Sequence, residues 1–232
     1  HFWGPDVYQG ASNAVLMYMS TVVKIAGVYA LINVFGQVFR DSYFFWIDLI
    51  SLLILASMFF GYITAWKQTS FRRLIAYSSI ANAGLMLFGL ADIHNGNIFV
   101  FVSAYALATI ALVVVNLIVN DETDSLENWE GIAWKHPLIG IALALGLFSL
   151  AGIPPMAGFF GKFTLLWAAV PHIPYTAILA LIASVIGAFV YLRLLLTALK
   201  KPSVHIRIQL SLEQTLVLVL TSIASIGAIY FL

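Results

Sequence analysis

Two lysines stand inside long uncharged runs of this chain. Lys24 lies in MYMSTVVKIAGVYALINV, residues 17–34, and Lys162 lies in SLAGIPPMAGFFGKF, residues 149–163. A lysine at the centre of a membrane span costs about 2.5–3.5 kcal/mol on insertion scales, so it needs polar partners or a task. Burial disfavours the charged form of a lysine, which lets its amine exchange a proton near neutral pH. Two such amines joined by water and hydroxyls predict a proton relay rather than a nucleophilic or redox centre.

Small polar side chains at helical spacing are the candidate partners of this relay. On a helix, Ser20 and Thr21 fall on the same face as Lys24, at positions i−4 and i−3. A second polar stripe, which we take as the candidate bridge between the lysines, consists of Tyr105, Thr109 and Asn116. Ordinary helix–helix hydrogen bonding is the alternative interpretation of that stripe. For each lysine the alternative is a side chain that extends toward the end of its helix to reach water.

The composition predicts that these segments are membrane helices. Hydrophobic residues make up 62% of the chain and charged residues 9%, whereas soluble domains contain about 45–50% and 25%. Because a bilayer offers open backbone groups no partner, every span must be helical. We predict an all-α polytopic bundle of about seven spans. Runs long enough to cross about 30 Å of hydrocarbon at about 1.5 Å per residue occur at 13–35, 44–66, 74–91, 97–119, 137–170, 175–198 and 210–232.

The fifth of these runs is too long for one straight span. A helix over 137–170, about 34 residues, would measure roughly 51 Å. Pro154 and Pro155 remove backbone donors and clash with the preceding turn, so the helix must break there. Broken helices at membrane depth are tolerated where they are buried in protein or line a wet cavity, typically an ion site. We predict an irregular backbone at Gly152–Pro155, with Lys162 pointing to the interior.

Several classes of site are not expected. The chain has no cysteine, which excludes disulfides, thiolate iron–sulfur clusters and a catalytic thiol within it. With a net charge of +1 and no basic run, no nucleic-acid partner is expected. The Gly161-Lys162 pair is not a phosphate loop, because Met156 and Phe163 replace the required glycine and Ser or Thr. We expect no metal ion and no cofactor in this chain. The opening HFWGPD, without an initiator Met or a signal-peptide layout, is expected of a fragment of a longer protein.

Four blocks of the sequence resemble, in the same order, the signature blocks of the antiporter-like subunits of respiratory complex I. The blocks are HFWGPDVYQGA, TVVKIAGVYAL, WKQTSFRRLIAYSSIANAG and FSLAGIPPMAGFFGKF. The form PDVYQGA is similar to the subunit termed N rather than to subunits L and M. The resemblance covers the whole chain and implies the C-terminal half of such a subunit. Residues 13–35 would be helix 8, 44–198 the second five-helix repeat (helices 9–13) and 210–232 helix 14, all within one transmembrane domain, 1–232.

The resemblance also implies roles for single residues. Lys24 matches the central lysine on helix 8 of the family, and Lys162 matches the terminal lysine on its broken helix 12. Asn82 stands where many members have histidine, which removes a titrating group but leaves an amide that can hold a water. The stretch ASNAV, residues 11–15, replaces a proline-bearing APTPV and loosens the expected entry to helix 8. The other essential pair of the family, a glutamate and a lysine, would lie upstream of His1.

By resemblance, the chain would be a proton-translocating membrane subunit of an NADH:quinone oxidoreductase-type complex, with no redox site of its own. FMN, iron–sulfur clusters and quinone would be bound by other subunits. Its partners would be lipid and other membrane subunits, including homologous antiporter-like and small membrane subunits, in a bacterial inner membrane or an equivalent energy-transducing membrane. Two alternatives remain: a cation/proton antiporter subunit of a multi-subunit exchanger, and a structural membrane scaffold whose lysines pair with partner subunits. The PDVYQGA block favours the NADH:quinone oxidoreductase subunit over the exchanger subunit.

Lysine and arginine counts predict the sidedness of the bundle. Loops that are rich in these residues face the cytoplasm, so loops 67–73 and 200–207 should be cytoplasmic and Leu232 should lie on the outer side. Single cysteines placed in these loops of the cysteine-free chain can be labelled in sealed vesicles. Labelling of both basic loops from outside would contradict the assignment. The opposite side has only Arg40, whereas the basic side collects Lys67, Arg72, Arg73, Lys135, Lys200, Lys201 and Arg207.

Overall fold

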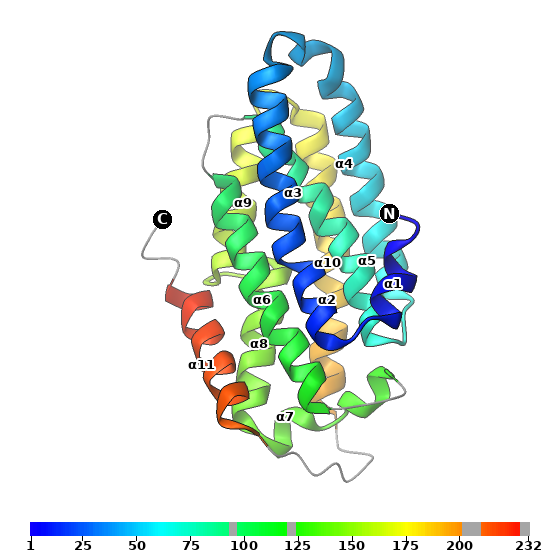
Figure 1. Cartoon of the computed structure of the whole chain (residues 1–232), viewed down its shortest axis with the longest axis vertical. Coiled ribbons are helices and arrows are strands. Elements are labelled where there is room, and N and C mark those ends of the chain that lie inside the picture. Colours follow the sequence, from blue (N-terminus) through cyan, green and yellow to red (C-terminus); the bar gives the residue numbers. More distant parts are fainter. Residues whose placement is uncertain (93–96, 120–123, 201–209, 228–232) are drawn as a thin grey trace.

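The computed structural model describes residues 1–92, 97–119, 124–200 and 210–227, and within these ranges every regular element is helical (Figure 1). The long helices run along one axis of the molecule in alternating directions, so the predicted all-α bundle is confirmed. Five helical segments are long and apolar enough to cross a membrane. The main helices are α2 (Asn13–Ser20), α3 (Val22–Asn33), α4 (Tyr43–Trp66), α5 (Phe71–Met86), α6 (Asn97–Val119), α8 (Pro137–Ala151), α9 (Ala157–Ala169), α10 (Pro174–Leu199) and α11 (Leu212–Gly227).

Shorter helical segments join or flank these helices. The predicted loop between the fourth and fifth spans contains two of them, and Trp129 on the first is buried with its ring stacked on Phe71 at 4.6 Å between centroids. The last predicted span is represented by α11, because residues 228–232 lie outside the described ranges. The short segments are α1 (Gly4–Gly10), η1 (Val34–Val38), η2 (Arg40–Ser42), η3 (Leu87–Leu90), η4 (Leu126–Trp129) and α7 (Ile132–Lys135).

The first predicted span, 13–35, corresponds to one apolar helical segment, Asn13–Val38, which is distorted at Thr21. Between α2 and α3, Thr21 has φ −116° and ψ −75°, which departs from helical geometry. The carbonyl of Met17 accepts the Thr21 hydroxyl at 2.6 Å, the Thr21 amide at 3.1 Å and the Ser20 hydroxyl at 3.1 Å. Hydroxyls that bond to a carbonyl of their own helix favour such bends. The helix then continues to Val38 through the π-helical η1.

Close backbone contacts join α4, α5 and α10. A Cβ on Gly61 of α4 would lie 2.7 Å from the amide nitrogen of Ala81 and from the carbonyl oxygen of Tyr77, both on α5. A Cβ on Gly187 of α10 would lie 2.5 Å from the ring of Tyr62. Only glycine permits these approaches. The three helices therefore meet along one buried seam, and α5 and α6 are the most enclosed spans of the bundle.

The fifth predicted span is broken, as the proline pair predicts. The first half, α8, ends at Ala151, and α9 begins at Ala157. Gly152 terminates α8 in the left-handed conformation, with φ +77°, which a residue with a Cβ adopts only at a cost. In Figure 1 the two halves follow one another along the long axis, and α6 packs against both.

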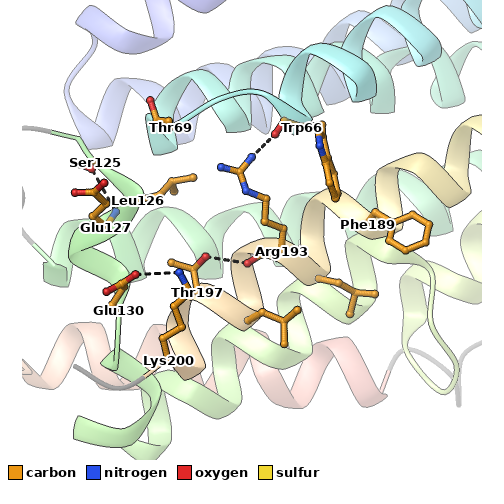
Figure 2. A pocket seen from close by; sticks show the side chains of 12 residues that line it. Trp66, Thr69, Ser125, Leu126, Glu127, Glu130, Phe189, Arg193, Thr197 and Lys200 are labelled. Carbon is orange, nitrogen blue, oxygen red and sulfur yellow. Dashed lines mark hydrogen bonds and ion pairs between the residues drawn. The ribbon is translucent and has the colours of Figure 1, made fainter. Parts of the chain in front are cut away.

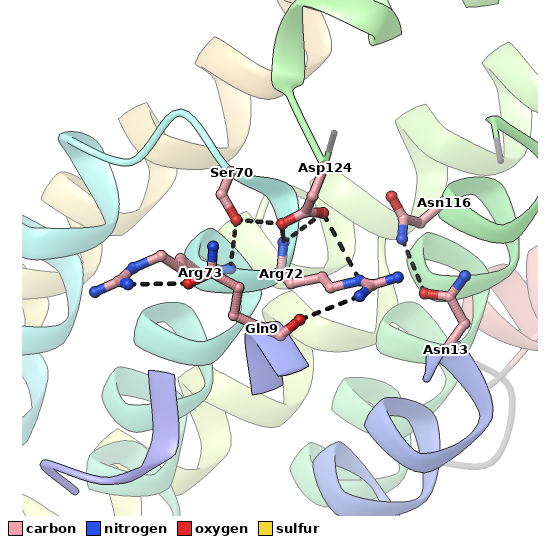
Figure 3. Close-up of polar contacts among 7 residues, drawn as sticks. All are labelled: Gln9, Asn13, Ser70, Arg72, Arg73, Asn116 and Asp124. Carbon is pink, nitrogen blue, oxygen red and sulfur yellow. Dashed lines mark hydrogen bonds and ion pairs between the residues drawn. The ribbon is translucent and has the colours of Figure 1, made fainter. Parts of the chain in front are cut away.

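Polar contacts anchor the start of α5 (Figure 3). The Asp124 carboxylate accepts the Ser70 hydroxyl and the Arg72 amide, the latter at 3.2 Å, and forms an ion pair with Arg72 Nε at 3.8 Å. Gln9 then joins α1 to the same end, because its carbonyl accepts from Arg72 at 3.1 Å and its side chain accepts from Arg73 at 3.0 Å. These contacts fix α5 and α1 relative to one another.

We expect Asp124→Ala to destabilise the bundle more than Asp124→Asn. Asp124 has φ +54°, a conformation that Asn tolerates and Ala resists. Alanine also leaves the Arg72 amide and the Ser70 hydroxyl without their acceptor, for a combined loss of about 2–4 kcal/mol, whereas asparagine should lose about 1 kcal/mol. Thermal unfolding midpoints in detergent and hydrogen exchange of the Phe71–Leu74 amides measure the effect. The exposed Asp41→Ala is the control, and an equal, small change in Asp124→Ala and Asp41→Ala would contradict this role.

Candidate functional site

Lys24 reaches into the bundle from a helix at its surface. No residue of α3 is fully buried, and the Lys24 side chain is itself only half-buried. Its Nζ nevertheless points inward, where it donates to the main-chain carbonyl of Ser79 on α5 and lies 3.4 Å from Tyr105 Oη on α6. The same Nζ is 5.1 Å from the centroid of the Tyr105 ring, within the range of a cation–π interaction. The amine therefore contacts protein oxygens and an aromatic face.

Ser79 is the junction of a small hydroxyl network beside Lys24. Its Oγ accepts from Tyr105 Oη at 3.4 Å and lies 3.4 Å from Tyr8 Oη. Burial raises the pKa of Tyr8, so its phenol stays protonated at neutral pH. A cavity of about 230 Å³ adjoins Lys24, Tyr8 and Ser79, and its volume is enough for several water molecules.

Ser20 and Thr21 are buried, as a polar stripe beside Lys24 predicts, but they do not bond to its amine. Both hydroxyls donate to Met17 of their own helix, and among the described residues the hydrogen bonds of Lys24 Nζ go to Ser79 and Tyr105 instead. The helical wheel places these side chains on the Lys24 face correctly. Their predicted role in holding water or relaying a proton stays a prediction.

Lys162 is enclosed and bound to the end of the broken helix. The residue is 5% exposed, and its Nζ donates to the carbonyl of Leu150 at 2.6 Å and to that of Ala151 at 3.3 Å. The last carbonyls of a helix have no partner within that helix and carry the negative end of its dipole. The break and the lysine thus form one unit, since the break frees the oxygens that hold the amine.

The segment between the two half-helices gives this unit its shape. A Cβ on Gly152 would lie 3.0 Å from Lys162 Cδ, so the glycine leaves room for the lysine stem. Pro154 and Pro155 are exposed and contact neither amine, which agrees with their predicted role as helix breakers. A second cavity, of about 250 Å³, lies beside Gly152, Lys162 and Ser184.

The predicted stripe on α6 divides between two places. Tyr105 contacts Lys24, and one turn later Thr109 donates to the Tyr105 carbonyl at 2.8 Å. Asn116 lies near the other end of α6 and donates to Asn13 at 3.0 Å (Figure 3). A Cβ on Gly161 would lie 2.7 Å from Phe101 Cα of α6, which is one turn before Tyr105. Tyr105 and Thr109 therefore belong to the Lys24 site, α9 packs on α6 one turn away at Phe101, and Asn116 stands apart.

Asn82 belongs to a polar cluster on the other side of α5. Its amide donates to the Ser78 carbonyl at 2.8 Å and to Tyr191 Oη at 2.9 Å, and Ser78 Oγ lies 2.6 Å from the same Tyr191 Oη. The residue predictions omitted Tyr62, Ser78, Ser79 and Tyr191. The sequence did contain a signal for part of this cluster, because two consecutive serines lie about one helical turn before Asn82 in IAYSSIANAG. Within the described residues no group of three or more His, Cys, Asp or Glu side chains is placed to hold a metal ion.

Residues 1–187 match the family model described as NADH:quinone oxidoreductase/Mrp antiporter, TM. NADH-quinone oxidoreductase subunit N of Pelobacter propionicus is 38% identical over 200 residues, which cover 84% of this chain and 43% of the relative. The protein of the same name from Desulforamulus reducens is 34% identical over 232 residues, 97% of this chain and 49% of the relative. The chain thus spans about half the length of the curated relatives it matches.

Solved structures show the same arrangement of helices. A chain of respiratory complex I from Thermus thermophilus with bound aureothin matches with a TM-score of 0.87 and 31% identity, over 99% of this chain and 52% of that chain. A chain of the Mrp complex from Dietzia sp. matches with a TM-score of 0.78 and 23% identity, over 88% of this chain and 39% of that chain. The second match supports the fold alone.

Proposed function

Because this chain belongs to the NADH:quinone oxidoreductase/Mrp antiporter transmembrane family, we propose that it is a proton-translocating membrane subunit of an NADH:quinone oxidoreductase-type complex. It is an integral membrane protein, since the family is a transmembrane one and five of its helical segments are long and apolar enough to span. The relatives named NADH-quinone oxidoreductase subunit N support the proposal.

The placement of the two lysine amines is the observation that carries this function. Both project into the bundle and both are held by main-chain carbonyls, Lys24 by Ser79 and Lys162 by Leu150 and Ala151. Within the described residues neither amine forms a salt bridge with a carboxylate. Carbonyl dipoles stabilise an ammonium less than a carboxylate does, so each amine can release its proton and take up another.

In the proposed relay, protons move between the lysines through hydroxyls and cavity water. Tyr105 Oη, 3.4 Å from Lys24 Nζ and 3.4 Å from Ser79 Oγ, can accept a proton from one neighbour as it gives its own to another. The cavities beside Lys24 and Lys162 provide space for the water that completes the path. The chain itself carries no redox site in this proposal. FMN, iron–sulfur clusters and quinone belong to other subunits of the complex.

The remaining proposals concern surroundings and alternatives. We place the chain in a bacterial inner membrane or an equivalent one, with its C-terminus outside, among lipid and other membrane subunits. Residues 44–198 would form a five-helix repeat, as the family resemblance implies.

An exchanger subunit would use the same lysines without NADH oxidation, and the likeness to the Mrp complex supports the fold of this chain only. A scaffold would need lysines bound to partner subunits, whereas these amines already bind carbonyls of their own chain.

Lys24→Ala and Lys162→Ala should each lower NADH-driven proton uptake into inverted vesicles by about tenfold or more, because each removes a group that takes up and releases the proton. The amount of assembled complex in the membrane should stay unchanged. Lys24→Arg sharpens the test, since arginine keeps the charge but does not release its proton.

The relay predicts loss of uptake in Lys24→Arg, whereas a scaffold role predicts that it behaves as the unaltered protein. The exposed Lys67→Ala is the control. Full uptake in both alanine variants would contradict the relay, and proton uptake without NADH, driven by a sodium gradient, would favour the exchanger.

A further inference from the structure

A pocket of about 630 Å³ opens at one end of the bundle, between the ends of α4 and α10 and the short segment η4 (Figure 2). Hydrogen bonds hold its walls in place. The Leu126 amide of η4 donates to the Thr69 carbonyl at 2.8 Å, and the Trp134 indole nitrogen donates to the Leu199 carbonyl at 2.7 Å. Pockets of about 300–1,000 Å³ accommodate small molecules. This pocket therefore has the size and the support of a binding site.

The pocket lies at the level where two membrane helices end. Helix α4 ends at Trp66 and α10 at Leu199, and both belong to segments long and apolar enough to cross a membrane. Tryptophan is enriched at the membrane–water interface, because its ring is apolar and its N–H is polar. Trp66 is exposed, and its ring meets that of Phe189 edge-on at 6.3 Å between centroids. A molecule in this pocket would contact both water and lipid.

An apolar strip on the surface of α10 leads from the pocket toward the membrane interior. It consists of Phe189, Val185 and Ile182, each more than half exposed. Its members are three or four positions apart, so they lie on one face of the helix. Leu196 in the pocket wall is exposed as well. A polar pocket that continues into an apolar strip suits a molecule with a headgroup and an acyl chain.

The charged side chains of the pocket balance one another. Two are cationic, Arg193 and Lys200, and two are acidic, Glu127 and Glu130. Lys200 Nζ pairs with Glu130 at 3.1 Å. Glu127 is exposed, and within the described ranges neither it nor Arg193 forms an ion pair. One cation and one carboxylate are therefore left to bind a ligand.

The Arg193 guanidinium has donors to spare. It donates one N–H to the Trp66 carbonyl, and a guanidinium has five N–H groups. In Figure 2 its side chain extends across the pocket toward the end of α4, whereas Glu127 stands on η4. Arginine binds phosphate with two parallel hydrogen bonds, and a carboxylate accepts strong hydrogen bonds from an ammonium. The pair thus complements a ligand that carries one phosphate and one ammonium.

We propose that this pocket binds the headgroup of a phosphatidylethanolamine-type lipid. Arg193 holds the phosphate, Glu127 accepts from the primary ammonium, and one acyl chain lies on the strip of Phe189, Val185 and Ile182. A choline headgroup matches less well, because its methylated nitrogen has no N–H to donate. A glycerol headgroup leaves Glu127 without a cation. The site is separate from Lys24 and Lys162 and does not depend on the proton relay.

A photoreactive phosphatidylethanolamine, with a diazirine in one acyl chain, tests the site in the assembled complex. The complex is reconstituted into dioleoylphosphatidylcholine vesicles that contain a small fraction of the probe, irradiated and digested. Mass spectrometry should find the label on the α10 peptide around Phe189. Probes with the same chains and a choline or glycerol headgroup should label this peptide about fivefold less, since each loses one charge-assisted contact.

Two variants separate the contacts of the headgroup. Arg193→Gln should lower labelling by the ethanolamine probe about fivefold or more, because it removes the phosphate partner. Glu127→Gln should lower it to the level of the choline probe and leave choline labelling unchanged. Since Glu127 is exposed, its effect does not depend on the packing of α10. The controls Arg40→Gln and Glu213→Gln, both exposed and outside the pocket, should label as the unaltered protein does.

Three results would overturn the lipid site. The first is equal labelling of the α10 peptide by the ethanolamine and choline probes, and the second is stronger labelling by the glycerol probe. The third is a full preference for ethanolamine in Glu127→Gln. A high-resolution map of the complex should show a lipid headgroup between Arg193 and Glu127, and a side chain of another subunit in that position would also contradict the proposal.

Discussion

Main-chain carbonyl oxygens hold both intramembrane lysines, and the rest of the bundle depends on these contacts. An ammonium in hydrocarbon needs oxygen partners, but a carboxylate would keep it charged as an ion pair. Ser79 supplies a carbonyl from the middle of a helix, and Leu150 with Ala151 supplies them from a helix end. The second arrangement depends on the broken span, since the last carbonyls of α8 have no amide partner within that helix. The interruption of the fifth span is thus part of the Lys162 site itself.

Close helix packing at glycines accompanies these contacts. Around Lys162, two glycines let neighbouring helices approach closely. Gly161 packs on the backbone of α6, and a Cβ on Gly158 would lie 1.9 Å from the Ser149 carbonyl oxygen. On the other side of the bundle Gly61 and Gly187 bring α4 and α10 onto α5 and Tyr62. Polar groups and small residues therefore alternate along the same interfaces, as expected where lipid provides no hydrophobic drive between helices.

The sequence predicted the architecture well because length and hydropathy constrain membrane helices strongly. The spans, the break at Gly152 and the enclosure of Lys162 all follow from counting residues and placing prolines. The contacts of Ser20 and Thr21 could not be predicted, because a serine or threonine hydroxyl on a helix can bond either to a carbonyl of its own helix or to a neighbouring side chain, and spacing alone does not decide between them. Asn116 lies on the same face of α6 as Tyr105 but binds Asn13 near the other end of that helix. Helical spacing predicts which face a side chain occupies and does not predict which neighbouring residue lies at the same depth in the bundle. The cluster of Tyr62, Ser78, Asn82 and Tyr191 was missed because its members come from three helices. A local sequence pattern does not predict how three helices pack together.

The carbonyl contacts of the lysines have a consequence for comparative genetics. A main-chain oxygen is present whatever side chain occupies its position, so the partner of Lys24 at Ser79 can change identity without losing the contact. Correlated substitution between aligned sequences should therefore fail to pair either lysine with the residues that bind it. Charge-reversal suppressors should be absent for the same reason, because no acidic side chain among the described residues pairs with either lysine. Pairwise coupling should instead mark side-chain pairs such as Tyr191 with Ser78 and Asn116 with Asn13.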